Sequence, residues 1–222
     1  MLLPTKPLRA VFFDWNGTLL NDLILVYGSI CHIFQKFGLS PPTLDEYRAE
    51  ITSNYMEFYW GHGIPRTMDA NAMNAIRKQY FEAHWDEVTI HEHVGTLTYR
   101  MFQLGMRSGM VSAESGLILP QRLRQFHLNN AFDIVRGDAH NKEATLLECA
   151  HALGVSPDES AYVDDTYDGI TSALRVGMRA VGVTHGYHTS ERIRAAQPDS
   201  LFVADTCIEA MNILTRESQR EY

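Results

Sequence analysis

Short apolar runs that alternate with segments of helical periodicity constrain the fold of this chain more than any other feature. The apolar runs lie at 106–112, 132–136, 160–164 and 180–184, and the helical segments lie between them at 117–126, 142–153 and 168–176. Strands and helices in alternation imply right-handed crossovers, and therefore a parallel, doubly wound α/β sheet. Gly105, Gly154 and Gly177 fall where helices should end. We expect a strand at 200–204 and a helix at 208–214 to close the domain.

The N-terminal part of the chain predicts one more strand and then a helical insert. Apolar residues from Ala10 lead to Asp14, and a Trp-Asn-Gly-Thr loop follows, as expected for a buried strand that ends at a turn. The apolar spacing then becomes helical as far as about residue 85. We therefore expect an α/β core from residues 1–21 and 89–222, with an α-helical cap inserted at 22–88. A chain of 222 residues is long enough to form both.

Charge and apolar content narrow the classes of partner. The chain carries 19 Lys and Arg against 27 Asp and Glu, a formal net charge of -8, and has no basic cluster. We therefore expect no nucleic-acid partner. Neither a stretch of 18 apolar residues nor a signal-peptide pattern is present, so we expect a cytoplasmic protein that does not enter the membrane. The cysteines Cys31, Cys149 and Cys207 are far apart and receive no role.

Polar residues end three of the expected strands. Asp14 ends the first, Ser112 ends another, and Asp164 with Asp165 ends a third. Lys142 opens one of the expected helices. Because ligands of open parallel sheets bind beyond the carboxyl ends of the strands, these residues mark the expected site.

Taken in order, these residues resemble the four motifs of the haloacid dehalogenase superfamily, and the resemblance spans nearly the whole chain. The first motif of the family, Asp-x-Asp-x-Thr, stands here as Asp14-Trp15-Asn16-Gly17-Thr18. The second motif is matched by Ser112, the third by Lys142, and the fourth by the acids Asp164, Asp165 and Asp168. The resemblance implies a Rossmann-like core and a hydrolase that uses Mg²⁺ to act on a small phosphorylated substrate.

The resemblance also implies a role for each matched residue. Asp14 would attack phosphorus and form an aspartyl-phosphate that water then hydrolyses. The ligands implied for Mg²⁺ are Asp14, the backbone carbonyl of Asn16, Asp165 and Asp168, an oxygen-only set suited to a hard cation. Asp164 would lie beside these ligands without touching the ion. Ser112 would donate its hydroxyl to the phosphoryl oxygens, and Lys142 would add a fixed positive charge.

Further contacts with the substrate are expected beside these residues. Gly17 and Thr18 belong to the first motif, and backbone N–H groups near Asn16 and Gly17 would add hydrogen-bond donors. Ala113 follows Ser112 at a position where many relatives carry Asn, so one contact of the family is missing here.

Asn16 is the main departure from the family pattern. Most phosphatases of the superfamily carry Asp at this position, where it protonates the leaving alkoxide and then activates water. An amide has no proton to give at neutral pH, although its backbone carbonyl can still bind a metal. We therefore expect nucleophilic attack to survive and the activity on poor leaving groups to be reduced.

Several interpretations of Asn16 stay open. A phosphatase could take its acid and base from the cap, with His62 and His84 as candidates, or could use substrates with better leaving groups. A phosphonate or haloacid hydrolase is the alternative within the superfamily, and the phosphonate route would need a cap lysine, Lys36 or Lys78. A weakened phosphate-binding or regulatory protein is the third interpretation. Deamidation of Asn16 to Asp is a fourth.

The helical insert resembles the caps of phosphoglycolate phosphatases and sugar-phosphate phosphatases. Closure of such a cap would exclude water and complete the site. Candidates to face the substrate are Asn54, Tyr55 and His62. His91 and His93 lie where the chain should return to the sheet, and we interpret them as hinge residues and not as metal ligands. The expected assembly is a monomer or a homodimer.

Overall fold

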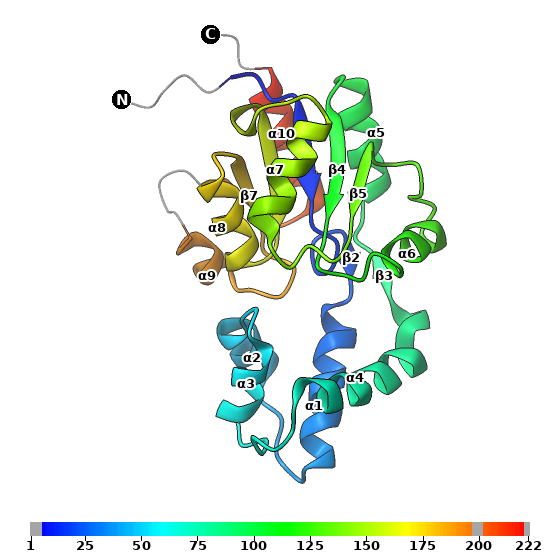
Figure 1. Ribbon diagram of the computed structural model, residues 1–222, viewed down its shortest axis with the longest axis vertical. Helices are drawn as coiled ribbons and strands as arrows, with labels where there is room; N and C mark the ends of the chain where they lie inside the picture. Colours follow the sequence, from blue (N-terminus) through cyan, green and yellow to red (C-terminus); the bar gives the residue numbers. More distant parts are fainter. Residues whose placement is uncertain (1–5, 197–201, 220–222) are drawn as a thin grey trace.

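A six-stranded parallel sheet forms the centre of the protein in the computed structural model, which describes residues 6–196 and 202–219 (Figure 1). Its strands are β1 (Ala10–Phe13), β4 (Arg107–Val111), β5 (Ile134–Arg136), β6 (Ser160–Asp164), β7 (Arg179–Val183) and β8 (Phe202–Ala204). They lie in the order β5-β4-β1-β6-β7-β8. The parallel sheet expected from the alternating pattern is confirmed. Residues 200 and 201 of the expected last strand lie outside the described part of the chain.

The register of the central strands aligns their carboxyl ends. Phe13 of β1 pairs with Met110 of β4 on one side and with Val163 of β6 on the other. The residues that follow these partners therefore meet at one edge of the sheet. All four residues of β1 are fully buried, as expected for a central strand with helices on both faces.

Helices cover both faces of the sheet. The helices α5 (Val94–Gln103), α6 (Leu119–Gln125) and α10 (Cys207–Ser218) pack on the face that carries Val11 and Phe13. The helices α7 (Lys142–Ala152) and α8 (Tyr167–Arg175) pack on the face that carries Ala10 and Phe12. The short helix α9 (Ser190–Arg194) lies on this second face, because Ile193 packs against Gly182. A 3₁₀ turn at Pro157–Glu159 precedes β6.

Residues 22–88 form four α-helices beyond the carboxyl ends of the strands (Figure 1). They are α1 (Leu23–Lys36), α2 (Leu44–Glu50), α3 (Tyr55–Gly61) and α4 (Ala70–His84), and a 3₁₀ turn at Trp85–Glu87 follows. Their apolar faces share a hydrophobic cluster of their own, centred on Ile33, Phe34 and Tyr59. We call these four helices the cap.

Two short antiparallel strands join the cap to the sheet domain. The strands β2 (Leu20–Asn21) and β3 (Thr89–Ile90) pair with each other at the two ends of the cap. The backbone N–H of His91 adds a hydrogen bond to the carbonyl oxygen of Leu19. The chain therefore leaves and re-enters the sheet domain at one place. Within the described residues, no helix is both long and apolar enough to cross a membrane.

Candidate active site

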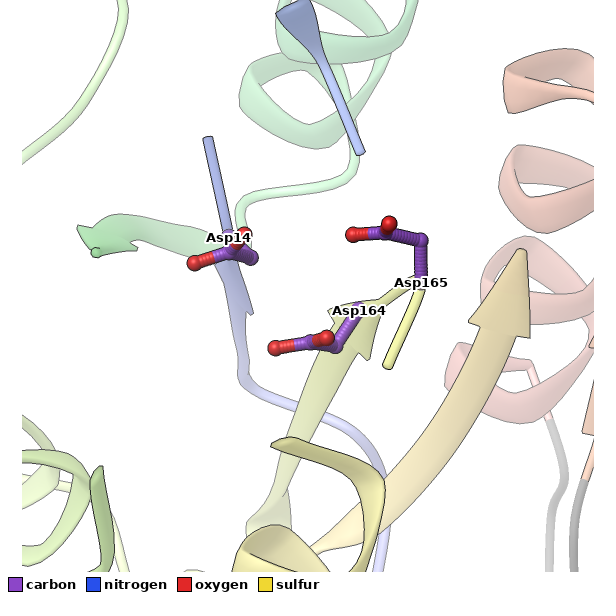
Figure 2. Close-up of side chains that lie close together, drawn as sticks. All are labelled: Asp14, Asp164 and Asp165. Atoms are coloured by element: carbon purple, nitrogen blue, oxygen red, sulfur yellow. The ribbon is translucent and has the colours of Figure 1, made fainter. Parts of the chain in front are cut away.

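Three carboxylates meet where β1 and β6 end. The N–H of Asp14 donates to the carbonyl of Val163 at 2.9 Å, which places Asp14 next to Asp164. Asp165 follows directly, and one oxygen from each of the three side chains lies within 4.8 Å of the others (Figure 2). All three residues are buried, with Asp14 6% exposed and the other two fully enclosed. Such a group of hard oxygen ligands is suited to Mg²⁺ or a similar cation.

Lys142 supplies positive charge to this group. Its ammonium donates to Oδ1 of Asp14 at 3.0 Å and to Oδ2 of Asp164 at 2.5 Å. Lys142 is the first residue of α7, and the side chain of Asn141 caps that helix by accepting from the N–H of Ala144. The helix start therefore fixes the lysine in place.

Burial and charge shift the pKa values of these groups. Burial raises the pKa of Asp14 to about 7, although Lys142 opposes the shift. Burial also raises the pKa of Asp165 well above its ordinary value, and the neighbouring Asp164 and Asp14 add to this. Burial alone would lower the pKa of Lys142, but the two carboxylates outweigh it and raise that pKa. One ammonium faces three carboxylates, so the site lacks positive charge.

Asp165 is held by the first-motif loop and by the loop after β7. Its oxygens accept from the hydroxyl of Thr18 at 2.8 Å and from the N–H of Tyr187 at 2.6 Å. A Cβ atom at Gly17 or at Gly186 would overlap this carboxylate, and Gly17 also has a φ of +75°. Thr18, expected to contact the substrate, thus bonds to Asp165.

Asn16 turns its amide toward a buried acid that the sequence did not single out. Its Nδ2 donates to Oδ2 of Asp22 at 2.8 Å. Asp22 also accepts from the N–H of Gly17 at 2.9 Å and from the hydroxyl of Tyr187 at 2.8 Å. Burial raises the pKa of Asp22 to about 6, and these hydrogen bonds oppose the shift. In the sequence, Asp22 looks like an ordinary helix cap before α1, although its side chain makes no capping hydrogen bond.

Asp168 lies apart from the three carboxylates. It belongs to the first turn of α8, and its Oδ2 accepts from the N–H of Ser53 in the cap at 3.2 Å. Asp164, expected to lie beside the metal ligands, belongs to the group of three carboxylates. Its other oxygen accepts from the N–H and the hydroxyl of Thr166 at 2.7 and 2.6 Å.

A cavity of about 830 Å³ opens between the sheet domain and the cap. Asp14, Asn16, Ser112, Ala113 and Lys142 line its sheet side. Ser112 follows β4 directly, is 1% exposed, and its hydroxyl accepts from the N–H of Glu114 at 3.2 Å. The cavity therefore brings the expected nucleophile, hydroxyl and ammonium to a single surface.

The match to a known family agrees with this geometry. Residues 11–183 match the family described as "Haloacid dehalogenase-like hydrolase". The chain belongs to this family. The matched segment runs from β1 to β7 and so includes every motif residue named above.

Curated relatives within the haloacid dehalogenase-like hydrolases are distant. A Clostridium perfringens protein called "Putative pyrophosphatase PpaX" is 26% identical over 219 residues, which cover 94% of this chain and 98% of that protein. The phosphoglycolate phosphatase of Salmonella paratyphi A is 26% identical over 149 residues, which cover 63% of this chain and 59% of that protein. The chain thus matches little more than half the length of the second relative.

Solved structures share the haloacid dehalogenase-like fold. A haloacid dehalogenase-like protein of unknown function from Agrobacterium tumefaciens superimposes with a TM-score of 0.78 at 21% identity, covering 96% of this chain and all of that one. A structure titled "predicted phosphatase" from Clostridium acetobutylicum gives a TM-score of 0.76 at 18% identity, covering 95% and 100% of the two chains. At these identities the likeness concerns the fold.

The cap residues that the sequence suggested as contacts with the substrate do not line the cavity. Among the described residues that line the cavity, the cap contributes Tyr47, Ile51, Thr52 and Ser53. His62 instead bonds to Glu50 at 2.8 Å. The remaining candidates that do not line the cavity are Lys36, Asn54, Tyr55, Lys78 and His84.

The two hinge histidines do not form a pair. The ring of His91 lies against the ring of His185, with the centroids 3.8 Å apart and the planes tilted by 43°, and His93 adopts a left-handed backbone with a φ of 68° before α5. Burial, with His185 adding to it, lowers the pKa of His91 to about 4. His91 therefore packs between the hinge and the loop after β7.

Proposed function

We propose that this chain is a Mg²⁺-dependent phosphohydrolase that acts on a small phosphorylated metabolite through Asp14. The observation that carries the proposal is the position of Asp14, which lines the cavity, bonds to Lys142 and adjoins two further buried carboxylates. The names of the curated relatives, a pyrophosphatase and phosphoglycolate phosphatases, agree with phosphate chemistry.

The donor set fits a divalent cation. Three buried carboxylates face one ammonium, and burial, with the neighbouring carboxylates adding to it, raises the pKa values of Asp14 and Asp165. We propose Asp14, Asp165 and the backbone carbonyl of Asn16 as ligands, with Asp164 close enough to join them. Asp168, also a candidate, would first have to leave the N–H of Ser53. Bound Mg²⁺ would lower the pKa of Asp14 and neutralise charge on the phosphate.

The reaction follows from the residues that face the cavity. A carboxylate oxygen of Asp14 attacks phosphorus in line, and the bond from phosphorus to the ester oxygen breaks. The leaving alkoxide takes a proton from water and departs as the alcohol. Water then attacks the aspartyl-phosphate, giving inorganic phosphate and regenerating Asp14. Lys142 holds Asp14 in position, and the hydroxyl of Ser112 donates to the phosphoryl oxygens.

Asn16 predicts slow turnover of alkyl esters. An amide has no proton to give at neutral pH, and the amide of Asn16 donates to Asp22. This favours substrates whose leaving group needs no acid, such as acyl or aryl phosphates. It also supports a second candidate function, a phosphate-binding regulatory protein in which the aspartyl-phosphate is long-lived. The phosphonate alternative finds no support, because neither Lys36 nor Lys78 lines the cavity.

Release of inorganic phosphate tests the proposal. We expect Mg²⁺-dependent release from an aryl phosphate and from acetyl phosphate, and a loss of at least 10³-fold in Asp14→Asn, because the amide is a poor nucleophile. Asp86→Asn, an exposed acid of the cap, is the matched control and should retain activity. Equal rates in Asp14→Asn and the parent protein would remove Asp14 as the nucleophile. Mg²⁺-dependent phosphate binding without release would favour the regulatory protein.

The remaining expectations are part of the same proposal. We propose residues 1–21 and 89–222 as the core and 22–88 as the cap, which the separate hydrophobic cluster of the four cap helices supports. Location in the cytoplasm and a monomeric or homodimeric state also remain proposals.

A further inference from the structure

The outer part of the cavity offers almost no free positive charge. Among the described residues, the Lys and Arg side chains that line it are Lys142 and Arg175. Lys142 is bound to Asp14 and Asp164. Arg175 donates to Glu143, another lining residue, at 3.1 Å. Each Lys and Arg side chain that lines the cavity therefore already faces a carboxylate.

Nearby cations of the cap and of the loop after β7 are also occupied. Arg48 of α2 donates to the carbonyl oxygens of Thr184, Gly186 and His188 at 2.6 to 3.0 Å. Arg192 donates to the carbonyl oxygen of Ala49 at 3.0 Å. Nδ1 of His188, another lining residue, accepts from the N–H of Tyr167 at 2.8 Å and therefore carries no proton, which leaves the ring uncharged. Arg48 and Arg192 thus hold the cap against the sheet domain, and Arg77 of the cap lies over the rings of Tyr55 and Phe81 and does not line the cavity.

The cap presents only uncharged side chains to the cavity. Tyr47, Ile51, Thr52 and Ser53 line it from this side, and Thr52 and Ser53 are exposed. The nearest charge on the opposite wall is the carboxylate of Asp168, which faces Ser53. An anionic group on the leaving part of a substrate would therefore meet hydroxyl groups and a like charge.

We infer that this site selects phosphate esters of uncharged, hydroxyl-bearing alcohols over esters whose alcohol carries a carboxylate or a second phosphate. The inference rests on the proposed function and adds the class of leaving group. The volume of about 830 Å³ lies in the upper part of the range for small-molecule sites and leaves room for an alcohol of sugar or nucleoside size. Hydroxyl and amide groups of Ser53, Thr52 and Asn141 can bond to such an alcohol without desolvating an unpaired charge.

Matched pairs of esters test this inference. In 2-hydroxyethyl phosphate and 2-phosphoglycolate, or in glycerol 3-phosphate and 3-phosphoglycerate, a CH₂OH group replaces a carboxylate at nearly constant size. At pH 8, where histidine is mostly neutral, we expect kcat/KM for the uncharged member to be at least tenfold higher in both pairs. Equal values, or a preference for the carboxylates, would overturn the inference. An aryl phosphate distinguishes a failure of this inference from a failure of the proposed function. If even the aryl phosphate gives no Asp14-dependent release of phosphate, the proposed function itself is rejected.

A charge placed on the cap wall gives a second test. Thr52→Lys adds a cation where the wall is neutral, and Thr52→Met adds similar length without charge. We expect Thr52→Lys alone to shift the kcat/KM ratio toward 2-phosphoglycolate by at least tenfold relative to 2-hydroxyethyl phosphate. If the kcat/KM ratio of the two esters stays constant in both variants, charge on the cap side of the cavity does not affect the choice of leaving group, and the inference is contradicted.

Discussion

Position 16 carries an amide in this chain, whereas most phosphatases of the family carry Asp there, and the buried carboxyl group of Asp22 lies beside it. The carboxyl group absent from position 16 is present at position 22, 2.8 Å from the amide nitrogen of Asn16. Asp22, however, is 3% exposed and does not belong to the cavity lining. It therefore orients Asn16 and Tyr187 but does not meet a substrate.

An exchange of the two residues should place an acid in the cavity. In the double variant Asn16→Asp, Asp22→Asn the hydrogen-bonded pair is kept, and a carboxyl group now lines the site. Because general acid catalysis contributes roughly 10²- to 10⁴-fold, we expect kcat on glycerol 3-phosphate to rise at least tenfold, measured as released phosphate.

The single variant Asn16→Asp is the control for this exchange. It places two carboxyl groups in contact, so one must keep its proton, and we expect a smaller gain that declines toward alkaline pH. No increase in the double variant, provided that its thermal stability matches that of the parent protein, would contradict an acid–base role for position 16.

The buried carboxyl of Asp22 should also make stability depend on pH. Its pKa is about 6 in the folded protein and 3.8 when exposed. The folded state thus holds the proton more tightly, and this contribution is complete below pH 4 and lost as the pH rises through 6. In metal-free protein, we expect the free energy of unfolding, relative to Asp22→Asn, to fall by roughly 2 kcal/mol between pH 4 and pH 6.5. Urea titrations at a series of pH values measure the free energy of unfolding of both proteins. A difference between them that does not change with pH would contradict the prediction.

The sequence predicted those site residues that end strands or begin helices. Asp14, Ser112 and Asp164 follow apolar runs whose alignment is fixed by the parallel sheet, and Lys142 begins a helix. Asp22 and Tyr187 could not be predicted, because they reach the site through loop geometry that apolar spacing does not encode. The position of Asp168 could not be predicted either, since its partner Ser53 belongs to the cap.

At the scale of elements, α2 is fastened to the loop after β7 by Arg48. The planar guanidinium of Arg48 bonds to the carbonyl oxygens of Thr184, Gly186 and His188, which a single ammonium group could not reach in the same geometry. This contact holds the cap closed over the cavity.

Loss of this contact should weaken substrate binding. We expect Arg48→Lys to raise KM for an aryl phosphate about fivefold or more with a smaller change in kcat, because a larger fraction of the protein has the cap open. Arg66→Ala removes an exposed cap arginine that lies 3.6 Å from Glu57 and over the Trp60 ring, and it should leave KM unchanged. Equal KM values in the two variants would show that Arg48 does not control closure.

Elements with a clear apolar pattern were predictable, and elements without one were not. Five of the sheet strands and the helices α6, α7, α8 and α10 lie where apolar periodicity indicates them. The strands β2 and β3 have two residues each, too few to show any alternation. The helix α9 has five residues. The helix α5 was anticipated only through Gly105, whose φ of +68° ends it.

At the scale of the whole molecule, the three buried carboxylates should link stability to Mg²⁺. A cation that binds the folded state alone stabilises it by about 2.7 kcal/mol at a concentration of 100 times Kd. For a chain of this length, this corresponds to a rise of about 5–10 °C in Tm. We expect this rise in the parent protein and its loss in Asp165→Asn, as measured by differential scanning fluorimetry with and without MgCl₂.

The variant Asp168→Asn tests whether Asp168 is a ligand of Mg²⁺ in addition to the three buried carboxylates. A retained Mg²⁺ response would mean that Asp168 serves the cap through Ser53, and a lost response would make it a ligand. If MgCl₂ does not change the Tm of the parent protein, the proposed metal site is contradicted.

The paired strands β2 and β3 also determine how the cap can move. The two crossings between cap and sheet domain are hydrogen-bonded to each other, with Leu20 opposite Ile90 and Asn21 opposite Thr89. Sliding one strand along the other would break this pairing, so the two crossings move together. The cap therefore has one hinge and not two, and a movement about this hinge would carry Thr52 and Ser53 toward the cavity or away from it.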